Sequence, residues 1–161
     1  MKKIVALTVN DKRYELAVAP NETLADVLRD KIGLTGTKKG CELGDCGSCT
    51  VLLNGKPVNA CLVLAIRAEG ETVRTIEGLE SASGLHPLQQ AFVEKGGIQC
   101  GFCSPGMILS SFSLLERNPD PGEDEIRRAI SGNLCRCTGY QKIIESVQAA
   151  AKTGRAKHAD P

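Results

Sequence analysis

Eight cysteines are the residues of this 161-residue chain whose type and spacing could do chemistry. Thiolates bind iron-sulfur clusters or zinc, pair as disulfides, or take part in thiol–disulfide exchange. The cysteines fall into two sets of four, the first set being Cys41, Cys46, Cys49 and Cys61 and the second set Cys100, Cys103, Cys135 and Cys137. The spacing within each set, and the compartment in which the chain works, decide among these uses.

The first set has the spacing C-x4-C-x2-C-x11-C. Its first three members match the arrangement by which plant-type ferredoxins hold a [2Fe-2S] cluster, and the fourth thiolate arrives from further along the chain. Glycines at positions 33, 36, 40, 44 and 47 allow tight turns that direct backbone N–H groups toward cluster sulfurs and offset their negative charge. A thiol–disulfide site would need two cysteines at a helix N-terminus rather than four in a glycine loop. The first set therefore predicts a [2Fe-2S] site.

The second set has the spacing C-x2-C-x31-C-x-C, in which each pair lies at a predicted helix end. Two loops could thus close on one site. Zinc also accepts four thiolates from paired cysteines, although its usual second pair is C-x2-C. A Rieske centre needs two histidine ligands, and the two histidines, His86 and His158, lie at a predicted helix start and in the tail. The residues exclude a Rieske centre and leave iron-sulfur and zinc open.

Composition narrows the setting in which these thiols work. The chain is 42% hydrophobic and 24% charged, which is typical of one or two small globular domains. A formal net charge of +1 predicts no nucleic-acid partner. The apolar stretch at residues 4–7 is too short for a signal peptide and the longest apolar run, residues 60–66, is too short to span a bilayer. We therefore expect a cytoplasmic location without membrane insertion, where clustered cysteines indicate metal or redox chemistry.

The elements that position the first set alternate between apolar and polar residues. The pattern predicts two hairpins, one short amphipathic helix, a shaped glycine loop and two further strands. In chain order these are strands at 4–9 and 14–18, a helix at 23–30, the loop at 33–47, strands at 50–53 and 56–59 around the turn Asn54-Gly55, and strands at 62–66 and 71–76.

The elements around the second set have helical periodicity instead. Apolar faces predict four helices, at residues 85–94, behind Pro105, around Ile126 to Ile130 and from Ile143 to Ala150. A linker near residues 77–84 separates the two halves. The tail after residue 152 has no apolar pattern, and we expect it to be frayed.

Four motifs carry a resemblance to a known family. They are GTKKGC at 36–41, CGSCTV at 46–51, QCGFCSPGM at 99–107 and GNLCRCTGY at 132–140. Together they closely resemble the iron-sulfur subunit of the molybdenum hydroxylase (xanthine oxidase) family, over about residues 4–151. The resemblance implies that the second set is another [2Fe-2S] site. It also implies an α+β chain with an N-terminal plant-ferredoxin-like β-grasp domain at 1–77, a C-terminal four-helix [2Fe-2S]-binding domain at 85–152, and a tail at 153–161.

The resemblance further implies an electron-transfer subunit without catalytic residues. Its partners would be a large subunit holding a molybdenum-pterin cytosine dinucleotide cofactor and a medium FAD subunit, in a dimer of heterotrimers. Electrons would pass from molybdenum through the second set, then the first set, to flavin, and a related aromatic thioester reductase would run this relay in reverse. Carried over by position, Gln99 and Cys137 would lie against the pterin, with Cys137 also binding iron. Alternatively, Gln99 is simply a loop amide.

Two other functions are compatible with parts of the sequence. A free-standing ferredoxin-type electron carrier suits the first set but leaves the helical half unexplained. A zinc-stabilised interaction module suits the second set. The adjacent Lys38 and Lys39 are expected to be solvated or at a subunit surface rather than catalytic.

Overall fold

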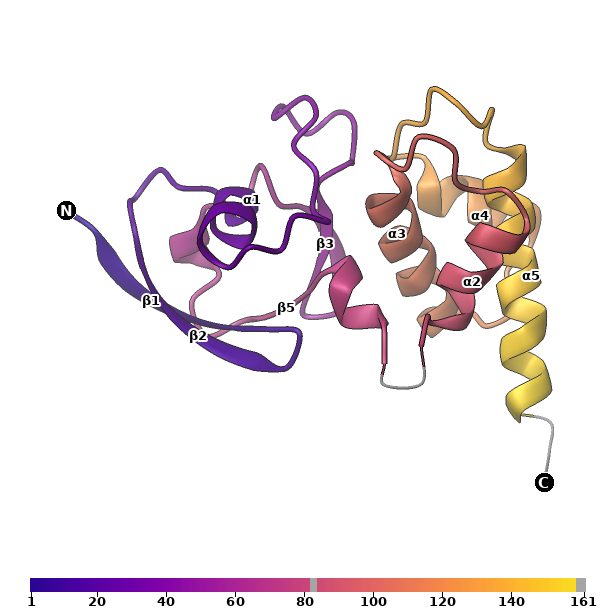
Figure 1. Cartoon of the computed structure of the whole chain (residues 1–161), viewed down its shortest axis with the longest axis horizontal. Helices are drawn as coiled ribbons and strands as arrows, with labels where there is room; N and C mark the ends of the chain where they lie inside the picture. The colour runs from indigo at the N-terminus through magenta and orange to yellow at the C-terminus, as the bar shows by residue number, and fades with distance from the viewer. Residues whose placement is uncertain (82–83, 159–161) are drawn as a thin grey trace.

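A computed structural model describes residues 1–81 and 84–158 of the chain (Figure 1). Within these residues, five strands form one mixed sheet in the order β2-β1-β5-β3-β4. β1 pairs with β5 in parallel, whereas the other neighbouring strands are antiparallel. The strands are β1 (Lys3–Val9), β2 (Lys12–Val18), β3 (Thr50–Leu53), β4 (Lys56–Asn59) and β5 (Thr72–Arg74). Both predicted hairpins are confirmed, as is the strand predicted near residues 71–76.

Both hairpins close through two residues in the left-handed backbone region. Asn10 and Asp11 have φ of 48° and 63°, and Asn54 and Gly55 have φ of 49° and 78°. Two consecutive positive φ values are those of a type I′ turn, whose twist matches that of the flanking strands. Asn and Gly tolerate this conformation, so the turn residues set the hairpin register locally.

A short helix covers one face of the sheet. α1 (Leu24–Asp26) begins at the N-cap Thr23 and continues as a π-helical turn, η1 (Val27–Lys31). The helix predicted at 23–30 is therefore confirmed, with Thr23 as its N-cap and its second half in the π-helical form. Its apolar side chains pack with those of β1 and β5 into the sheet core, which contains Val5, Leu7, Leu24, Leu28 and Val73.

The strand predicted at residues 62–66 is wrong. This segment makes only an isolated bridge between Leu64 and Thr23 and then turns into the 3-10 helix η2 (Ala65–Arg67). The Val63 carbonyl accepts from Leu24 N at 2.7 Å and Ala65 N donates to Glu22 O at 2.9 Å. Because these backbone groups are used at the start of α1, the apolar run has no neighbouring strand to extend.

The described residues after position 84 form four α-helices, which confirms the predicted number. They are α2 (Pro87–Glu94), α3 (Ser104–Arg117), α4 (Glu123–Ile130) and α5 (Gln141–His158). The 3-10 helix η3 (Ile76–Leu79) precedes them. α5 continues to His158, so the expected fraying after residue 152 is wrong as far as that residue. A helix already formed by packing can add further turns without an apolar face, here even through Thr153 and Gly154, which are poor helix formers.

Some sequence-based expectations fall on residues that are not described. The predicted linker includes residues 82–83 and the predicted tail includes residues 159–161, and these positions lie outside the described residues. Within the described residues, no helix combines the length and the apolar character needed to cross a membrane.

The helical half packs directly against the sheet half. Its core contains Leu88, Phe92, Met107, Ile126 and Ile143 together with Leu52 from β3. α3 lies beside β3 in Figure 1, which agrees with the presence of Leu52 in this core. As a result the loop before β3 and the loops before α3 and α5, which carry most of the cysteines, lie at the same end of the molecule (Figure 1).

Candidate metal centres

The cysteines of the first set come from one loop and the end of a hairpin. Cys41 and Cys46 lie in the loop between η1 and β3 and are half-buried. Cys49 directly precedes β3 and Cys61 follows β4, and both are buried. All eight cysteines of the chain lie within the described residues, and none of them forms a disulfide.

Backbone donors converge on the Cys41 sulfur. The N–H groups of Leu43 and Cys46 both donate to Cys41 Sγ at 3.4 Å. These hydrogen bonds lower the pKa of Cys41 to about 6, because they stabilise the thiolate. The glycine loop therefore places a metal-binding form of cysteine where N–H groups offset its charge, as the sequence predicts.

Cys49 has the opposite environment. Burial raises its pKa to about 11, and the neighbouring Cys61 thiol adds to this effect. Two buried thiols side by side favour the protonated form, unless a bound cation supplies positive charge. A metal is therefore the chemical partner that this pair of sulfurs fits.

The second set forms two pairs across a long sequence separation. Cys100 Sγ and Cys137 Sγ are 3.5 Å apart, and both residues are exposed. Burial raises the pKa of Cys103 to about 12, with the adjacent Cys135 contributing. Burial also opposes ionisation of Cys135, but hydrogen bonds from the Thr138 hydroxyl and N–H outweigh it and lower the pKa of Cys135.

In the second set, Cys100 Sγ and Cys137 Sγ form a close pair at 3.5 Å. Other thiols act on one another electrostatically: Cys46 lowers the pKa of Cys41, Cys61 raises that of Cys49, and Cys135 raises that of Cys103. In the part of the chain that the structure describes, no group of three or more His, Cys, Asp or Glu side chains is arranged to hold a metal ion. A [2Fe-2S] cluster takes four thiolates, which is the number that each half supplies.

Glycines of the first loop are required by close contacts. A Cβ on Gly40 would lie 2.9 Å from Cys46 Sγ and 2.7 Å from Ser48 Oγ. A Cβ on Gly44, whose φ is +89°, would lie 2.5 Å from Leu62 Cδ1. All three distances are shorter than real Cβ contacts. A side chain at Gly40 would displace Cys46 and Ser48, whereas at Gly44 the exposed Leu62 side chain could move and it is the positive φ that disfavours a side chain.

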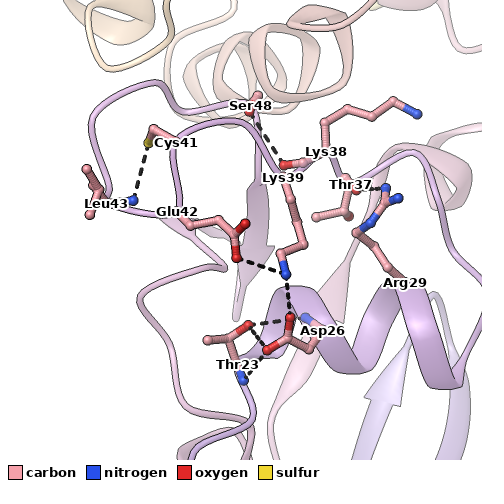
Figure 2. A network of polar contacts seen from close by, with 10 residues as sticks. All are labelled: Thr23, Asp26, Arg29, Thr37, Lys38, Lys39, Cys41, Glu42, Leu43 and Ser48. Carbon is pink, nitrogen blue, oxygen red and sulfur yellow. Dashed lines mark hydrogen bonds and ion pairs between the residues drawn. The ribbon is translucent and has the colours of Figure 1, made fainter.

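A charged network anchors the first loop to α1 (Figure 2). Lys39 Nζ lies 2.8 Å from Asp26 Oδ1 and 2.8 Å from Glu42 Oε2. Asp26 Oδ2 also accepts from Thr23 N at 2.9 Å and Thr23 Oγ1 at 2.7 Å, which completes a capping box at the start of α1. Figure 2 shows the Lys39 side chain pointing from the loop down to the helix.

The charges in this network perturb one another. Although burial opposes ionisation of Asp26, hydrogen bonds from Lys39 and Thr23 lower its pKa to about 2. The hydrogen bonds to Asp26 and Glu42 raise the pKa of Lys39. Of the two alternatives expected for Lys39, solvated or at a subunit surface, simple solvation does not describe it, because it forms ion pairs with Asp26 and Glu42. The Thr-x-x-Asp capping pattern was visible in the sequence, but its pairing with Lys39 depends on how the loop folds back.

The two sets meet at their loops. Leu134 N, one residue before Cys135, donates to the Cys46 carbonyl oxygen at 2.9 Å. Gln99, Cys100 and Cys137 are exposed. The second set therefore reaches the surface, while Cys49 and Cys61 of the first set are buried.

Comparisons with known proteins agree with this geometry. Residues 7–75 match the family described as "2Fe-2S iron-sulfur cluster binding domain", and residues 75–148 match the family described as "[2Fe-2S] binding domain". The second match favours iron-sulfur over zinc for the helical half. It also disfavours a carrier built on the first set alone.

Relatives of similar length are subunits of larger enzymes. The chain is 48% identical to the nicotinate dehydrogenase small FeS subunit of Eubacterium barkeri, over 94% of this chain and 98% of that one. It is 50% identical to the nicotine 6-hydroxylase small subunit of Paenarthrobacter nicotinovorans, over 89% of this chain and 86% of that one.

Solved structures show the same fold. A chain of quinoline 2-oxidoreductase from Pseudomonas putida 86 superposes with a TM-score of 0.92 at 46% identity, covering 96% of this chain and 97% of that one. The aldehyde oxidoreductase of Desulfovibrio desulfuricans ATCC 27774 also gives 0.92 at 43% identity, but only 17% of its chain is covered. From motifs, the four free thiols of each half and these relatives together, the chain belongs to the iron-sulfur subunits of the molybdenum hydroxylases, the non-catalytic electron-transfer components of those enzymes.

Proposed function

We propose that this chain relays electrons between a molybdenum-pterin site in a large partner subunit and FAD in a medium partner subunit. The observation that carries this proposal is the presence of four free thiols in each half, at two sites joined by the hydrogen bond from Leu134 N to the Cys46 carbonyl oxygen. The proposed ligands are Cys41, Cys46, Cys49 and Cys61 in the first set and Cys100, Cys103, Cys135 and Cys137 in the second. A [2Fe-2S] cluster, when bound, takes up and releases one electron at a time and makes or breaks no bond in the substrate.

Each half of the fold is assigned one cluster. We assign residues 1–77 to a ferredoxin-like β-grasp domain and residues 85–152 to a four-helix domain, each with its own cluster. Separate cores in the two halves support this division. The backbone donors to Cys41 and the Thr138 hydroxyl beside Cys135 would stabilise negative sulfur in the two sites.

The exposed side of the second set supports a place beside the pterin. Phe102 and Leu134 are 47% and 56% exposed, and they lie two and three residues along the chain from the exposed Cys100 and Cys137. Large apolar side chains at a surface that also presents thiols favour burial by a partner. In this assignment Gln99 offers its side-chain amide to the pterin, in the cytosine dinucleotide form, and Cys137 combines iron binding with proximity to it.

A second apolar surface supports a place for the flavin subunit. Leu43 is 73% exposed in the first loop, and Leu62 is 61% exposed next to Cys61. These side chains lie on the segments that carry the first set, so a partner docked there would lie near that site. The complete assembly proposed is a dimer of heterotrimers.

Purification of the tagged chain from its native host tests the proposal. We expect iron and acid-labile sulfide in equal amounts, two paramagnetic signals after reduction, and co-purification of a large molybdenum subunit and an FAD subunit. Phe102→Glu should release the large subunit, because it places a charge in the proposed contact. Val93→Glu is the matched control, since Val93 is 56% exposed on α2, a helix that carries no cysteine, and it should retain the complex.

Three results would contradict the proposal. Zinc without sulfide would remove the electron-transfer role. Recovery of the loaded chain without any partner would favour a free-standing ferredoxin-type carrier. Equal binding of the large subunit by the Phe102 and Val93 variants would move the contact to another face.

A further inference from the structure

One carbonyl group of the first loop receives an unusual number of donors. Gly47 lies between Cys46 and Cys49, and its carbonyl oxygen accepts from Thr50 N at 3.0 Å and from Thr50 Oγ1 at 2.6 Å. A third donor, Asn133 Nδ2, reaches the same oxygen at 2.9 Å. A carbonyl oxygen has two lone pairs, so three donors hold this peptide group in one orientation.

The third donor comes from the other half of the molecule. Asn133 precedes Cys135 by two residues and is 3% exposed. Its Nδ2 also donates to Thr50 Oγ1 at 3.1 Å, and its Oδ1 accepts from Ser110 Oγ on α3 at 2.7 Å. The carboxamide therefore uses both of its ends and ties the first loop to α3 and to the loop of the second set.

The backbones approach too closely for any side chain to intervene. A Cβ on Gly47, whose φ is +67°, would lie 2.1 Å from the Gly132 carbonyl oxygen. A Cβ on Gly106, in the first turn of α3, would lie 2.4 Å from the Gly47 carbonyl oxygen. Glycines on both sides thus make room for the Asn133 contact.

Asn133 also lines a surface cavity of about 220 Å³, together with residues that include Thr50, Asn59 and Ser110. Its hydrogen bonds to Gly47, Thr50 and Ser110 therefore fix the orientation of the carboxamide beside this cavity. The next residue, Leu134, makes the backbone contact between the two loops, because its N–H donates to Cys46 O at 2.9 Å.

We propose that Asn133 is a positioning residue that sets the electronic contact between the two cysteine sites by holding Gly47 and Thr50 against the loop of Cys135. This inference rests on the proposed function, since it needs a cluster in each site. One electron leaves one site as the other site takes it up, and no bond is made or broken. Asn133 touches no iron ligand through its side chain, so it acts through the two loops that it joins.

Asn133→Asp is the sharpest perturbation. Aspartate keeps the shape of the side chain and can still accept from Ser110, but it cannot donate to the Gly47 carbonyl and its charge repels that oxygen. Asn59→Asp is the matched control. Asn59 Nδ2 donates to the Gly44 carbonyl at 2.7 Å, which is the same kind of bond to the same loop, but it does not reach the helical half.

The readout is the magnetic interaction between the two reduced clusters in the loaded full chain. Dipolar coupling between two spins falls with the inverse cube of their separation, and exchange coupling falls more steeply. In the Asn133→Asp variant we expect the iron content to be unchanged and the paramagnetic signals of both reduced clusters to be present. The splitting of each signal by the spin of the other cluster should be lost. Asn59→Asp should retain the splitting.

The outcomes separate the two proposals. A wild-type chain without two reduced signals would refute the proposed function, and the electronic role of Asn133 with it. Full splitting in a loaded Asn133→Asp variant would refute the positioning role alone. If this variant does not load both sites, Ser110→Ala decides, because it removes one of the hydrogen bonds that orient the carboxamide and leaves the bond to Gly47 available. Weakened splitting in Ser110→Ala supports the role, and wild-type splitting overturns it.

Discussion

Replacing Asp26 by asparagine removes one charge from the network that fastens the first cysteine loop to α1. The asparagine carboxamide would still offer an oxygen to the Thr23 N–H and hydroxyl, so the capping geometry is kept and the ion pair with Lys39 is lost. We expect the loop and the helix to separate more often. The substitution therefore tests whether the ion pair between Lys39 and Asp26 stabilises the packing of the loop against α1.

The magnitude follows from the ionisation of Asp26. Its pKa is about 2 instead of the usual 3.8, because burial, which opposes ionisation, is outweighed by hydrogen bonds from Lys39 and Thr23. Its side chain is 26% exposed, so solvent screens the interaction only in part. A tenfold change in proton affinity corresponds to about 1.4 kcal/mol, and the ionised carboxylate therefore stabilises this contact by about 2 kcal/mol at neutral pH.

Amide hydrogen exchange of the loaded chain at pH 7 measures this contact. About 2 kcal/mol corresponds to roughly 30-fold more frequent opening, which should appear in residues 24–31 and 40–49. Glu15→Gln is a control for lost charge, since Glu15 pairs with Arg13 on the surface of β2 and its side chain is 63% exposed. It should leave exchange unchanged in both segments.

The pH dependence has a definite sign. Because the folded-state pKa of Asp26 is lowered, its stabilisation is complete above about pH 4 and is lost as the pH falls toward 2. The difference between the wild type and Asp26→Asn should therefore shrink over that interval. Equal exchange rates at pH 7, or additive effects of Asp26→Asn and Lys39→Met, would refute the anchoring role.

Three further predictions concern the cysteine sites and their support. Cys103→Ser should abolish one of two paramagnetic signals in the reduced chain and leave the other, whereas joint loss would contradict two independent sites. Gly106→Ala should lower the free energy of unfolding by about 1–3 kcal/mol through its contact with the Gly47 carbonyl, while Gly154→Ala, which meets nothing within 4 Å, should not. Removal of iron with a chelator and a reductant should increase proteolysis in residues 40–49 and 132–138 before the α2–α5 core unfolds, because bound metal stabilises these loops. Equal cleavage with and without iron would contradict this stabilisation.

Much of the local structure could be predicted because its causes are local. Asn54-Gly55 adopts two positive φ values that few other pairs tolerate, so this hairpin is determined by its turn. Apolar residues at helical spacing predicted the four helices after position 84, since such a face must be buried somewhere. The run at residues 62–66 misled the prediction because a short apolar segment has no period that distinguishes a strand from an extended connection.

The candidate sites were only partly predictable for a physical reason. The number and spacing of the cysteines alone predicted that four thiols could gather in each half. A metal cluster needs a set of donors, and glycine-containing loops between the cysteines allow the chain to bring those donors together. Which sulfur faces which, that Lys39 reaches back to Asp26, and that Asn133 joins both loops through Gly47 were decided by the tertiary structure. Those contacts depend on the packing of α3 against β3, and no local pattern encodes a distance between residues so far apart in the chain.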